Sequence, residues 1–83
     1  MRNFRECFDH LGNDEESAAE CIHCLKKHGE QVFFSKEKKR LVLGREGYDP
    51  TVSEYMEKIS TLLEIRTRKD YEKADDTYNL TMY

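Results

Sequence analysis

The chain has 83 residues, of which 37% are hydrophobic and 37% charged, with a formal net charge of -3 and a mean hydropathy of -0.91. A chain of this length builds one small core and leaves little room for a deep catalytic cleft, so we expect no enzymatic activity. The sequence has no run approaching the roughly 20 apolar residues of a transmembrane helix, and its start lacks the apolar run of a secretory signal. We therefore expect a cytoplasmic protein, with a nuclear location as the alternative, and no membrane partner.

Charge is distributed unevenly along the chain. Residues 1–25 and 46–83 each carry a net charge of -4, whereas residues 26–45 carry +5. The positive charge is therefore local, and it would favour a partner of complementary charge.

Two short helices are predicted first. Apolar residues recur at helical spacing at Phe4, Cys7, Phe8 and Leu11. This spacing predicts a first helix that ends at Gly12. A second helix is predicted over residues 14–28, because Asn13 with Glu16 can form its N-terminal cap and Gly29 suits the position after its C-terminus.

A β-hairpin is predicted next. Residues 31–35 and 40–43 are short β-prone runs, and the turn between them has the sequence Lys36-Glu37-Lys38-Lys39. The hairpin is therefore expected to have a basic tip.

The last predicted elements are a long helix and a tail. Asp49 and Pro50 are typical of a helix start, and the apolar stripe that follows consists of Val52, Tyr55, Met56, Ile59, Leu62 and Leu63. Helix-forming residues continue to residue 73, which predicts one long helix that extends into solvent. Residues 77–83 alternate apolar and polar side chains, as a tail or a final strand would.

These elements predict an α+β fold: two short N-terminal helices, a β-hairpin, a long C-terminal helix and a possible final strand. We expect one domain over residues 1–76, with residues 77–83 as the tail or extra strand. The order of second helix, hairpin and third helix resembles the latter half of winged-helix DNA-binding domains. In that resemblance residues 11–13 correspond to the turn, residues 14–28 to the recognition helix and residues 36–40 to the wing tip. It implies binding of nucleic acid or, as in other winged helices, of protein.

The cysteines and histidines offer one candidate site with defined chemistry. Four side chains of the type that tetrahedral zinc takes occur in two spaced pairs, Cys7 with His10 and Cys21 with Cys24. His28 is a substitute ligand. The alternative is that the cysteines pack in the apolar stripes of the first two helices as small hydrophobic residues, reduced as in other intracellular proteins. We expect this packing and no cofactor, with zinc as the alternative.

Two surfaces are candidates for binding a partner. The first is the hairpin tip, with Lys36, Lys38, Lys39 and Arg40, which suits phosphates or acidic side chains. The second is the C-terminal tyrosines Tyr71, Tyr78 and Tyr83, which suit a protein interface. The alternatives are a solvated turn and tyrosines half-buried on the protein's own core.

We expect a small non-catalytic binding protein that acts as regulator, adaptor or inhibitor of a larger protein or nucleoprotein. Accessory proteins of phages and mobile elements share this size and charge. One alternative is a winged-helix-like protein that binds nucleic acid through the basic hairpin, and another is a zinc-stabilised interaction module.

Overall fold

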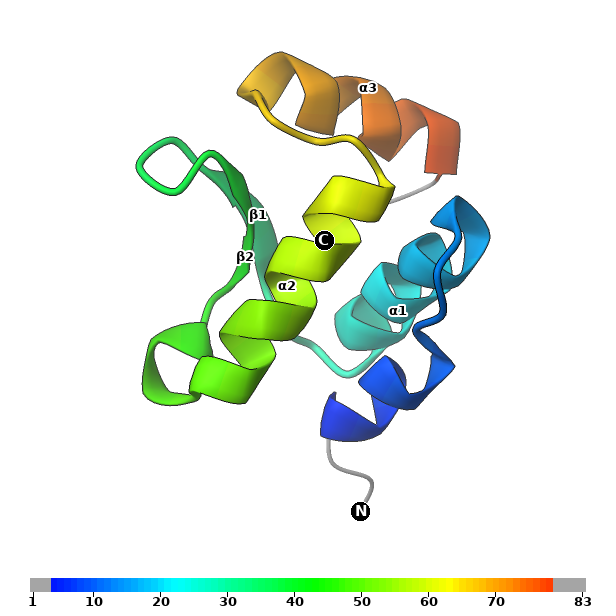
Figure 1. The fold of residues 1–83 in the computed structure, drawn as a ribbon, viewed down its shortest axis with the longest axis vertical. Helices are drawn as coiled ribbons and strands as arrows, with labels where there is room; N and C mark the ends of the chain where they lie inside the picture. Colours follow the sequence, from blue (N-terminus) through cyan, green and yellow to red (C-terminus); the bar gives the residue numbers. More distant parts are fainter. Residues whose placement is uncertain (1–3, 79–83) are drawn as a thin grey trace.

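The structure is a computed structural model, and it describes residues 4–78. Its elements, in chain order, are η1 (Phe4–His10, a 3-10 helix), α1 (Glu15–Lys27), β1 (Val32–Ser35), β2 (Arg40–Leu43), η2 (Glu46–Tyr48, a 3-10 helix), α2 (Pro50–Leu62) and α3 (Arg68–Tyr78). The predicted α+β class is confirmed. In Figure 1, α2 crosses the centre of the molecule, with the hairpin along one side of it and α1 and η1 along the other.

The two N-terminal elements differ in detail from the prediction. The first helix is the short 3-10 helix η1, which ends at His10 instead of Gly12. The cap of α1 is Asp14, whose carboxylate accepts a hydrogen bond from the backbone N–H of Ser17 at 3.0 Å. Hydrogen bonding by the side chain and by the backbone N–H of Ser17 holds the pKa of Asp14 below its usual value. The predicted role of Gly29 is confirmed, since its φ of 80° is the left-handed conformation that closes the helix.

The hairpin forms as predicted, and its register decides which residues reach the core. Val32 pairs with Leu43, and Phe34 pairs with Leu41. Because paired residues share a face of the sheet, these four side chains point the same way. All four are buried in the core or packed against it, whereas Phe33, on the opposite face, is 42% exposed.

A helix covers each outer edge of this two-stranded sheet. On the β2 side, the hydroxyl of Ser60 in α2 accepts a hydrogen bond from the N–H of Leu41 at 2.8 Å. On the β1 side, the hydroxyl of Tyr71 in α3 donates to the carbonyl of Val32 at 3.2 Å. These side-chain contacts satisfy backbone groups that an exposed edge would leave open to other chains.

A single core lies between the hairpin and the helices. Its buried apolar side chains are Cys7, Phe8, Ala18, Cys21, Ile22, Leu25, Val32, Leu41, Leu43, Val52, Met56, Ile59, Leu63, Ile65 and Ala74. The predicted start of the central helix is confirmed: Asp49 caps α2 by accepting from the N–H of Thr51 at 3.0 Å, and Pro50 is its first residue. Within residues 4–78, no helix combines the length and the apolar character needed to cross a bilayer.

The prediction of one long C-terminal helix is wrong. The chain turns after α2 because Glu64 adopts a left-handed φ of 57°, and the N–H groups of Glu64 and Ile65 donate back to the last turn of α2, to Thr61 at 3.1 Å and Ser60 at 2.9 Å. This arrangement ends a helix in the same way as Gly29 does for α1. The turn buries Ile65 in the core.

A second helix, α3, then returns across β1. Thr67 caps it by accepting from the N–H of Asp70 at 3.1 Å, and the carboxylate of Asp70 accepts from the N–H of Arg66 at 3.2 Å. Ala74 and Tyr71 hold α3 on the core and on β1. Thr77 and Tyr78, the first two residues of the predicted tail or strand, belong to α3, and residues 79–83 lie outside the described residues.

Replacing Glu64 by glycine should raise the free energy of unfolding by about 0.5–1 kcal/mol. The left-handed conformation costs about 1–2 kcal/mol for a residue with a Cβ atom, and the greater freedom of glycine in the unfolded chain offsets part of the gain. Urea denaturation measures the difference. Glu64→Ala is the matched control, because it removes the carboxylate and keeps the Cβ atom. A glycine variant no more stable than the alanine variant would contradict this account of the turn.

Replacing Tyr71 by phenylalanine should lower the free energy of unfolding by about 1 kcal/mol at neutral pH, through loss of the hydrogen bond to Val32. Burial raises the pKa of Tyr71 above its ordinary value of 10.0, and the negative charge of Asp75 adds to this shift. The phenol of Tyr71 therefore stays protonated to a higher pH in the folded state than in the unfolded state. Its contribution to the free energy of unfolding is complete below pH 10 and is lost as pH rises through the raised pKa.

The Tyr71→Phe variant should consequently lose stability less steeply than the wild type above pH 10, as measured by urea denaturation across a pH series. Tyr48→Phe is the control, because Tyr48 is 93% exposed. Equal alkaline slopes for the wild type and Tyr71→Phe would rule out this role for the phenol.

Candidate functional site

The hairpin turn and the end of α2 enclose a basic cavity. It has a volume of about 170 Å³, and the charged residues that line it are Lys38, Lys39, Arg40, Arg66 and Glu57. Four of these five side chains are cationic. Arg66 was not expected here, because the sequence placed it inside a continuous helix, and the turn after α2 brings it beside the hairpin.

Ser35 fixes the shape of the turn that carries the lysines. Its carbonyl accepts a hydrogen bond from the N–H of Lys39 at 2.8 Å, and its hydroxyl accepts from the N–H of Lys38 at 3.2 Å. Lys39 takes a left-handed φ of 55°, which lets the four-residue turn close on β2. The lysines therefore project from a turn with defined hydrogen bonds.

Arg40 differs from the lysines because it is bound inside the protein. Its side chain is 12% exposed, and its guanidinium lies 3.0 Å from the carboxylate of Glu46, itself 3% exposed. The same guanidinium donates to the hydroxyl of Ser53 at 2.9 Å and to the carbonyl of Leu41 at 2.8 Å. Arg40 thus joins β2 to η2 and α2, and Glu46 neutralises its charge.

The remaining cations define what we call the basic hairpin surface: Lys36, Lys38, Lys39 and Arg66. All four are exposed. Lys38 lies 3.7 Å from Glu46, at the outer limit of an ion pair. Within the part of the chain that the structure describes, the side chains of Lys36, Lys39 and Arg66 have no acidic partner. The surface keeps a local positive charge on a chain whose net charge is -3.

The predicted tyrosine surface is placed only in part. Tyr71 is half-buried, and its hydroxyl is occupied by the carbonyl of Val32. The side chain of Tyr78 and the whole of Tyr83 lie outside the described residues. Within residues 4–78, the aromatic side chains that are exposed are those of Phe33, Tyr48 and Tyr55, and of these Phe33 was not expected to be a surface residue. The alternation of the hairpin strands is the signal that would have identified Phe33.

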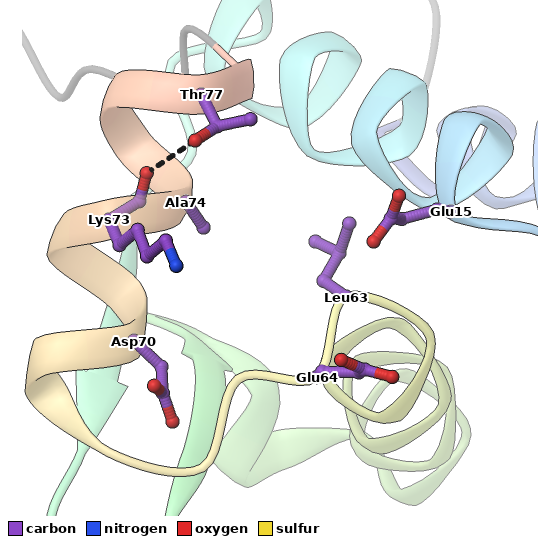
Figure 2. A pocket seen from close by; sticks show the side chains of 7 residues that line it. All are labelled: Glu15, Leu63, Glu64, Asp70, Lys73, Ala74 and Thr77. Carbon is purple, nitrogen blue, oxygen red and sulfur yellow. Dashed lines mark hydrogen bonds between the residues drawn. The ribbon is translucent and has the colours of Figure 1, made fainter.

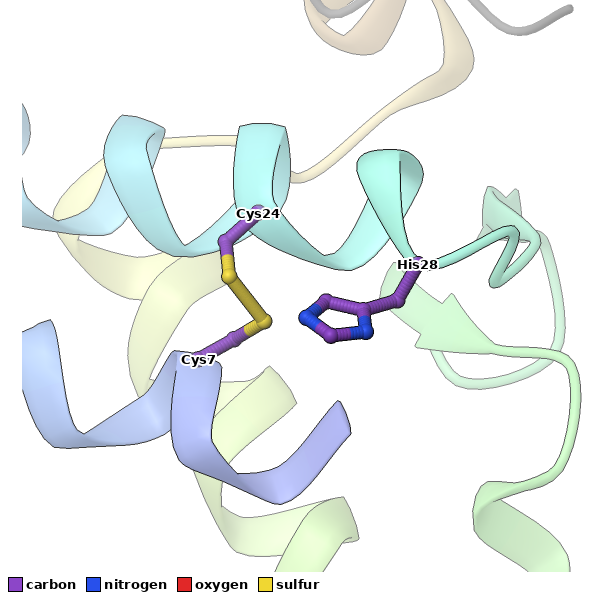
Figure 3. A group of neighbouring side chains, drawn as sticks. All are labelled: Cys7, Cys24 and His28. Atoms are coloured by element: carbon purple, nitrogen blue, oxygen red, sulfur yellow. A yellow bond between two sulfur atoms is a disulfide. The ribbon is translucent and has the colours of Figure 1, made fainter. Parts of the chain in front are cut away.

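Two of the predicted zinc ligands form a disulfide. Cys7 of η1 and Cys24 of α1 are covalently joined, with their Cα atoms 5.6 Å apart. The expectation that all three cysteines are reduced is therefore wrong for this pair, because the packing of η1 on α1 brings the two sulfur atoms together. His28, at the C-terminal end of α1, lies beside them, and the ligand atoms of all three residues are within 4.8 Å of one another (Figure 3).

The other two predicted ligands are not part of this ligand group. His10 ends η1 and is exposed. Cys21 is fully buried, and its thiol donates a hydrogen bond to the carbonyl of Cys7 at 3.2 Å. Burial raises the pKa of the Cys21 thiol to about 11, with a smaller effect from the charge of Glu20. Cys21 therefore packs in the core as a neutral thiol, as the sequence predicted.

A second cavity, of about 240 Å³, lies between the start of α1, the end of α2 and α3 (Figure 2). Its charged lining consists of Glu15, Glu64, Asp70 and Lys73. Figure 2 shows the amino group of Lys73 extending from α3 into the space that these carboxylates border. The carboxylate of Asp70 is also engaged by the backbone of Arg66. The cavity thus contains both signs of charge and offers no set of converging ligands for a cation.

The order of helix, hairpin and helix that suggested a winged helix is present as α1, the β-hairpin and α2. The first turn of α1 carries Glu15 and Glu16, and Asp14 caps it, so the helix begins with three acidic side chains. Negative charge at this position repels phosphate.

Comparison of the chain with protein-family models, with curated proteins and with solved structures finds no match.

Proposed function

We propose that the protein is a small non-catalytic binding protein that docks through the basic hairpin surface on an acidic face of a larger protein or nucleoprotein. It would act by occupying that face, as a regulator, adaptor or inhibitor. The observation that carries this proposal is the group of exposed cations around one turn of an acidic chain, three of them without an acidic partner among residues 4–78.

Rigidity at the base of the hairpin supports the proposal. The turn is closed by Ser35, and the strand that follows it is anchored by the buried pair of Arg40 and Glu46. A surface that is ordered before binding loses less conformational entropy when the partner docks. In Figure 1 the hairpin turn lies at the edge of the molecule, far from α1, where a partner can reach it.

The acidic remainder of the chain also matters for specificity. Residues 1–25 and 46–83 each carry a net charge of -4. A uniformly acidic partner is attracted to the hairpin and repelled by the rest of the molecule, so charge orients the encounter. We therefore expect association that slows as salt is added.

Nucleic acid is the second candidate partner. The specific observation in its favour is the cavity of about 170 Å³ bordered by Lys38, Lys39 and Arg66, in which a phosphate group would meet three cations. Each such contact contributes to affinity through the release of counterions and does so independently of sequence. The two candidate functions differ in the ligand of this surface, which is an acidic protein face in the first and a nucleic-acid backbone in the second.

The test is an affinity capture from cell lysate with the double variant Lys38→Glu with Lys39→Glu, compared with the wild type. We expect partners captured by the wild type to be lost from this variant. The control, Lys27→Glu with Lys58→Glu, makes the same change in net charge at two exposed positions of α1 and α2 that are not part of the basic hairpin surface. Capture that survives in the hairpin variant, or that is lost equally in the control, would show that the partner binds elsewhere.

Fluorescence anisotropy with labelled duplex DNA and duplex RNA separates the two candidates. Direct nucleic-acid binding should be abolished by the hairpin variant and should weaken steeply between about 50 and 200 mM salt. Capture of a protein that persists after nuclease treatment, without binding of either duplex, identifies the partner as an acidic protein.

A further inference from the structure

Three metal-binding side chains gather where η1 packs on α1. Cys24 and His28 are four residues apart and so lie on the same face of the helix. Cys7 reaches this face from η1, and Figure 3 shows the imidazole ring of His28 directed toward the two sulfur atoms. The group extends from the core to the surface, because Cys7 is fully buried, Cys24 partly exposed and His28 exposed.

The spacing of these ligand atoms is close to that of a tetrahedral metal site. Zinc bonds to sulfur at about 2.3 Å and to imidazole nitrogen at about 2.0–2.1 Å, so its ligand atoms are roughly 3.5–3.8 Å apart. In this protein the three ligand atoms already lie within 4.8 Å of one another. A metal would need the two sulfur atoms to separate and the imidazole to move inward from its position within 4.8 Å of them. Rotation of the exposed side chain of His28 and of the partly exposed side chain of Cys24 achieves such a shift while Cys7 stays in the core.

We propose that reduction of the Cys7–Cys24 disulfide creates a zinc site, with the two thiolates and the imidazole of His28 as protein ligands. Three protein ligands leave a fourth tetrahedral position, which a water molecule fills at the exposed side of His28. The ligand set of two thiolates and one imidazole suits zinc, whereas magnesium and calcium prefer oxygen ligands. The site differs from the set expected from the sequence, because His28 takes part in place of His10 and Cys21.

The chemistry has two balanced steps. In the first, two molecules of a thiol reductant transfer two electrons and two protons to the disulfide, which yields two cysteine thiols and one oxidised disulfide of the reductant. In the second, Zn²⁺ displaces the two thiol protons, binds both sulfur atoms as thiolates and releases two protons to solvent. Reoxidation reverses both steps and expels the metal.

The two states would hold the same pair of elements together. The disulfide ties η1 to α1 covalently, and zinc bridging the same sulfur atoms would tie them by coordination. Because metal ions bind the folded chain more tightly than the unfolded chain, zinc should compensate for part of the stability lost on reduction. The site thus lets the N-terminal element stay docked in either redox condition.

The experiment uses the full chain, reduced without oxygen and separated from the reductant, and Co²⁺ and Zn²⁺ as probes. We expect one metal ion per reduced chain by native mass spectrometry, and thiolate-to-cobalt charge-transfer absorption on addition of Co²⁺. The oxidised protein should bind neither ion. Should the reduced chain unfold without metal, far-ultraviolet circular dichroism should show that Zn²⁺ restores its helices, and failure to restore them would count against the site.

Single substitutions identify the ligands. Loss of an outer-shell partner typically weakens metal binding by about 10–100-fold, so we expect His28→Gln, which removes a direct ligand, to weaken it at least tenfold. His10→Gln is the matched control, an exposed histidine that should leave the affinity unchanged, and Cys21→Ala should leave one metal per chain. The proposal is overturned if the reduced wild type binds no metal, if His28→Gln binds as the wild type does, or if His10→Gln or Cys21→Ala binds markedly more weakly.

Discussion

Replacing Cys7 and Cys24 together by alanine should lower the free energy of unfolding by about 3 kcal/mol. The disulfide closes a loop with a sequence separation of 17 residues. A cross-link over a loop of this size restricts the unfolded chain and, in the chain-entropy account, stabilises the folded state by about 3 kcal/mol. For a chain of 83 residues this is a large share of the total free energy of unfolding, which is typically about 5–15 kcal/mol. Urea denaturation of the oxidised protein and of the double variant, both without reductant, measures the difference.

Cys21→Ala is the matched control for this experiment. Cys21 is as buried as Cys7, and its replacement removes a sulfur atom from the same core without opening a cross-link. It reports the packing part of the loss. The double variant removes two sulfur atoms, so packing alone should cost at most about twice the loss measured for Cys21→Ala. If the double variant loses no more free energy of unfolding than that, the disulfide does not stabilise the fold. Reduction of the wild type, without metal, should give a loss similar to that of the double variant.

The elements that the sequence predicted well have signals that lie within a few residues. Asp49 followed by Pro50 is a local description of a helix start, and Gly29 marks the end of α1 because few other residues adopt its conformation readily. The hairpin is also local, since its two strands are joined by a four-residue turn. Each of these features could be recognised without knowing what packs against it.

The break between α2 and α3 had a weaker signal. Helix formers continue through this region, and Glu64 occupies a left-handed position where glycine is the usual marker. One local feature does indicate the new helix, because Thr67 and Asp70 have the spacing of a capping pair. What decides the turn is tertiary: burial of Ile65 and the contact of Tyr71 with β1 stabilise the folded-back helix.

The candidate sites also divide into features with a local sequence signal and features that depend on tertiary packing. The lysines of the hairpin turn were predicted because a charged turn is exposed in most folds. The disulfide was not, since three cysteines allow three pairings and only the packing of η1 on α1 selects Cys7 with Cys24. Arg40 belongs by sequence to the basic tip, but its role depends on Glu46, a residue in the next element that the fold buries beside it.

Arg40→Met should lower the free energy of unfolding by about 3–5 kcal/mol, because it leaves the carboxylate of Glu46 buried without its main partner. Glu46 is 3% exposed, and Lys38, at 3.7 Å, is too distant and too solvated to replace the guanidinium. The variant also loses the hydrogen bonds that Arg40 donates to Ser53 and to Leu41. Thermal and urea denaturation measure the loss.

The double variant Arg40→Met with Glu46→Leu should recover most of this stability, since replacing both members of a buried ion pair by apolar residues is often neutral or stabilising. Lys39→Met is the control for loss of a cation from the same turn, and its effect should stay within about 0.5 kcal/mol, as is usual for an exposed position. Equal losses for Arg40→Met and for the double variant would show that the charge of Glu46 is not the cause. The predicted recovery also separates an effect on folding from an effect on binding. Because Arg40 holds the hairpin in place, a charge reversal at Arg40 would unfold the surface that Lys38 and Lys39 present. Only variants of the exposed lysines therefore test the proposed docking.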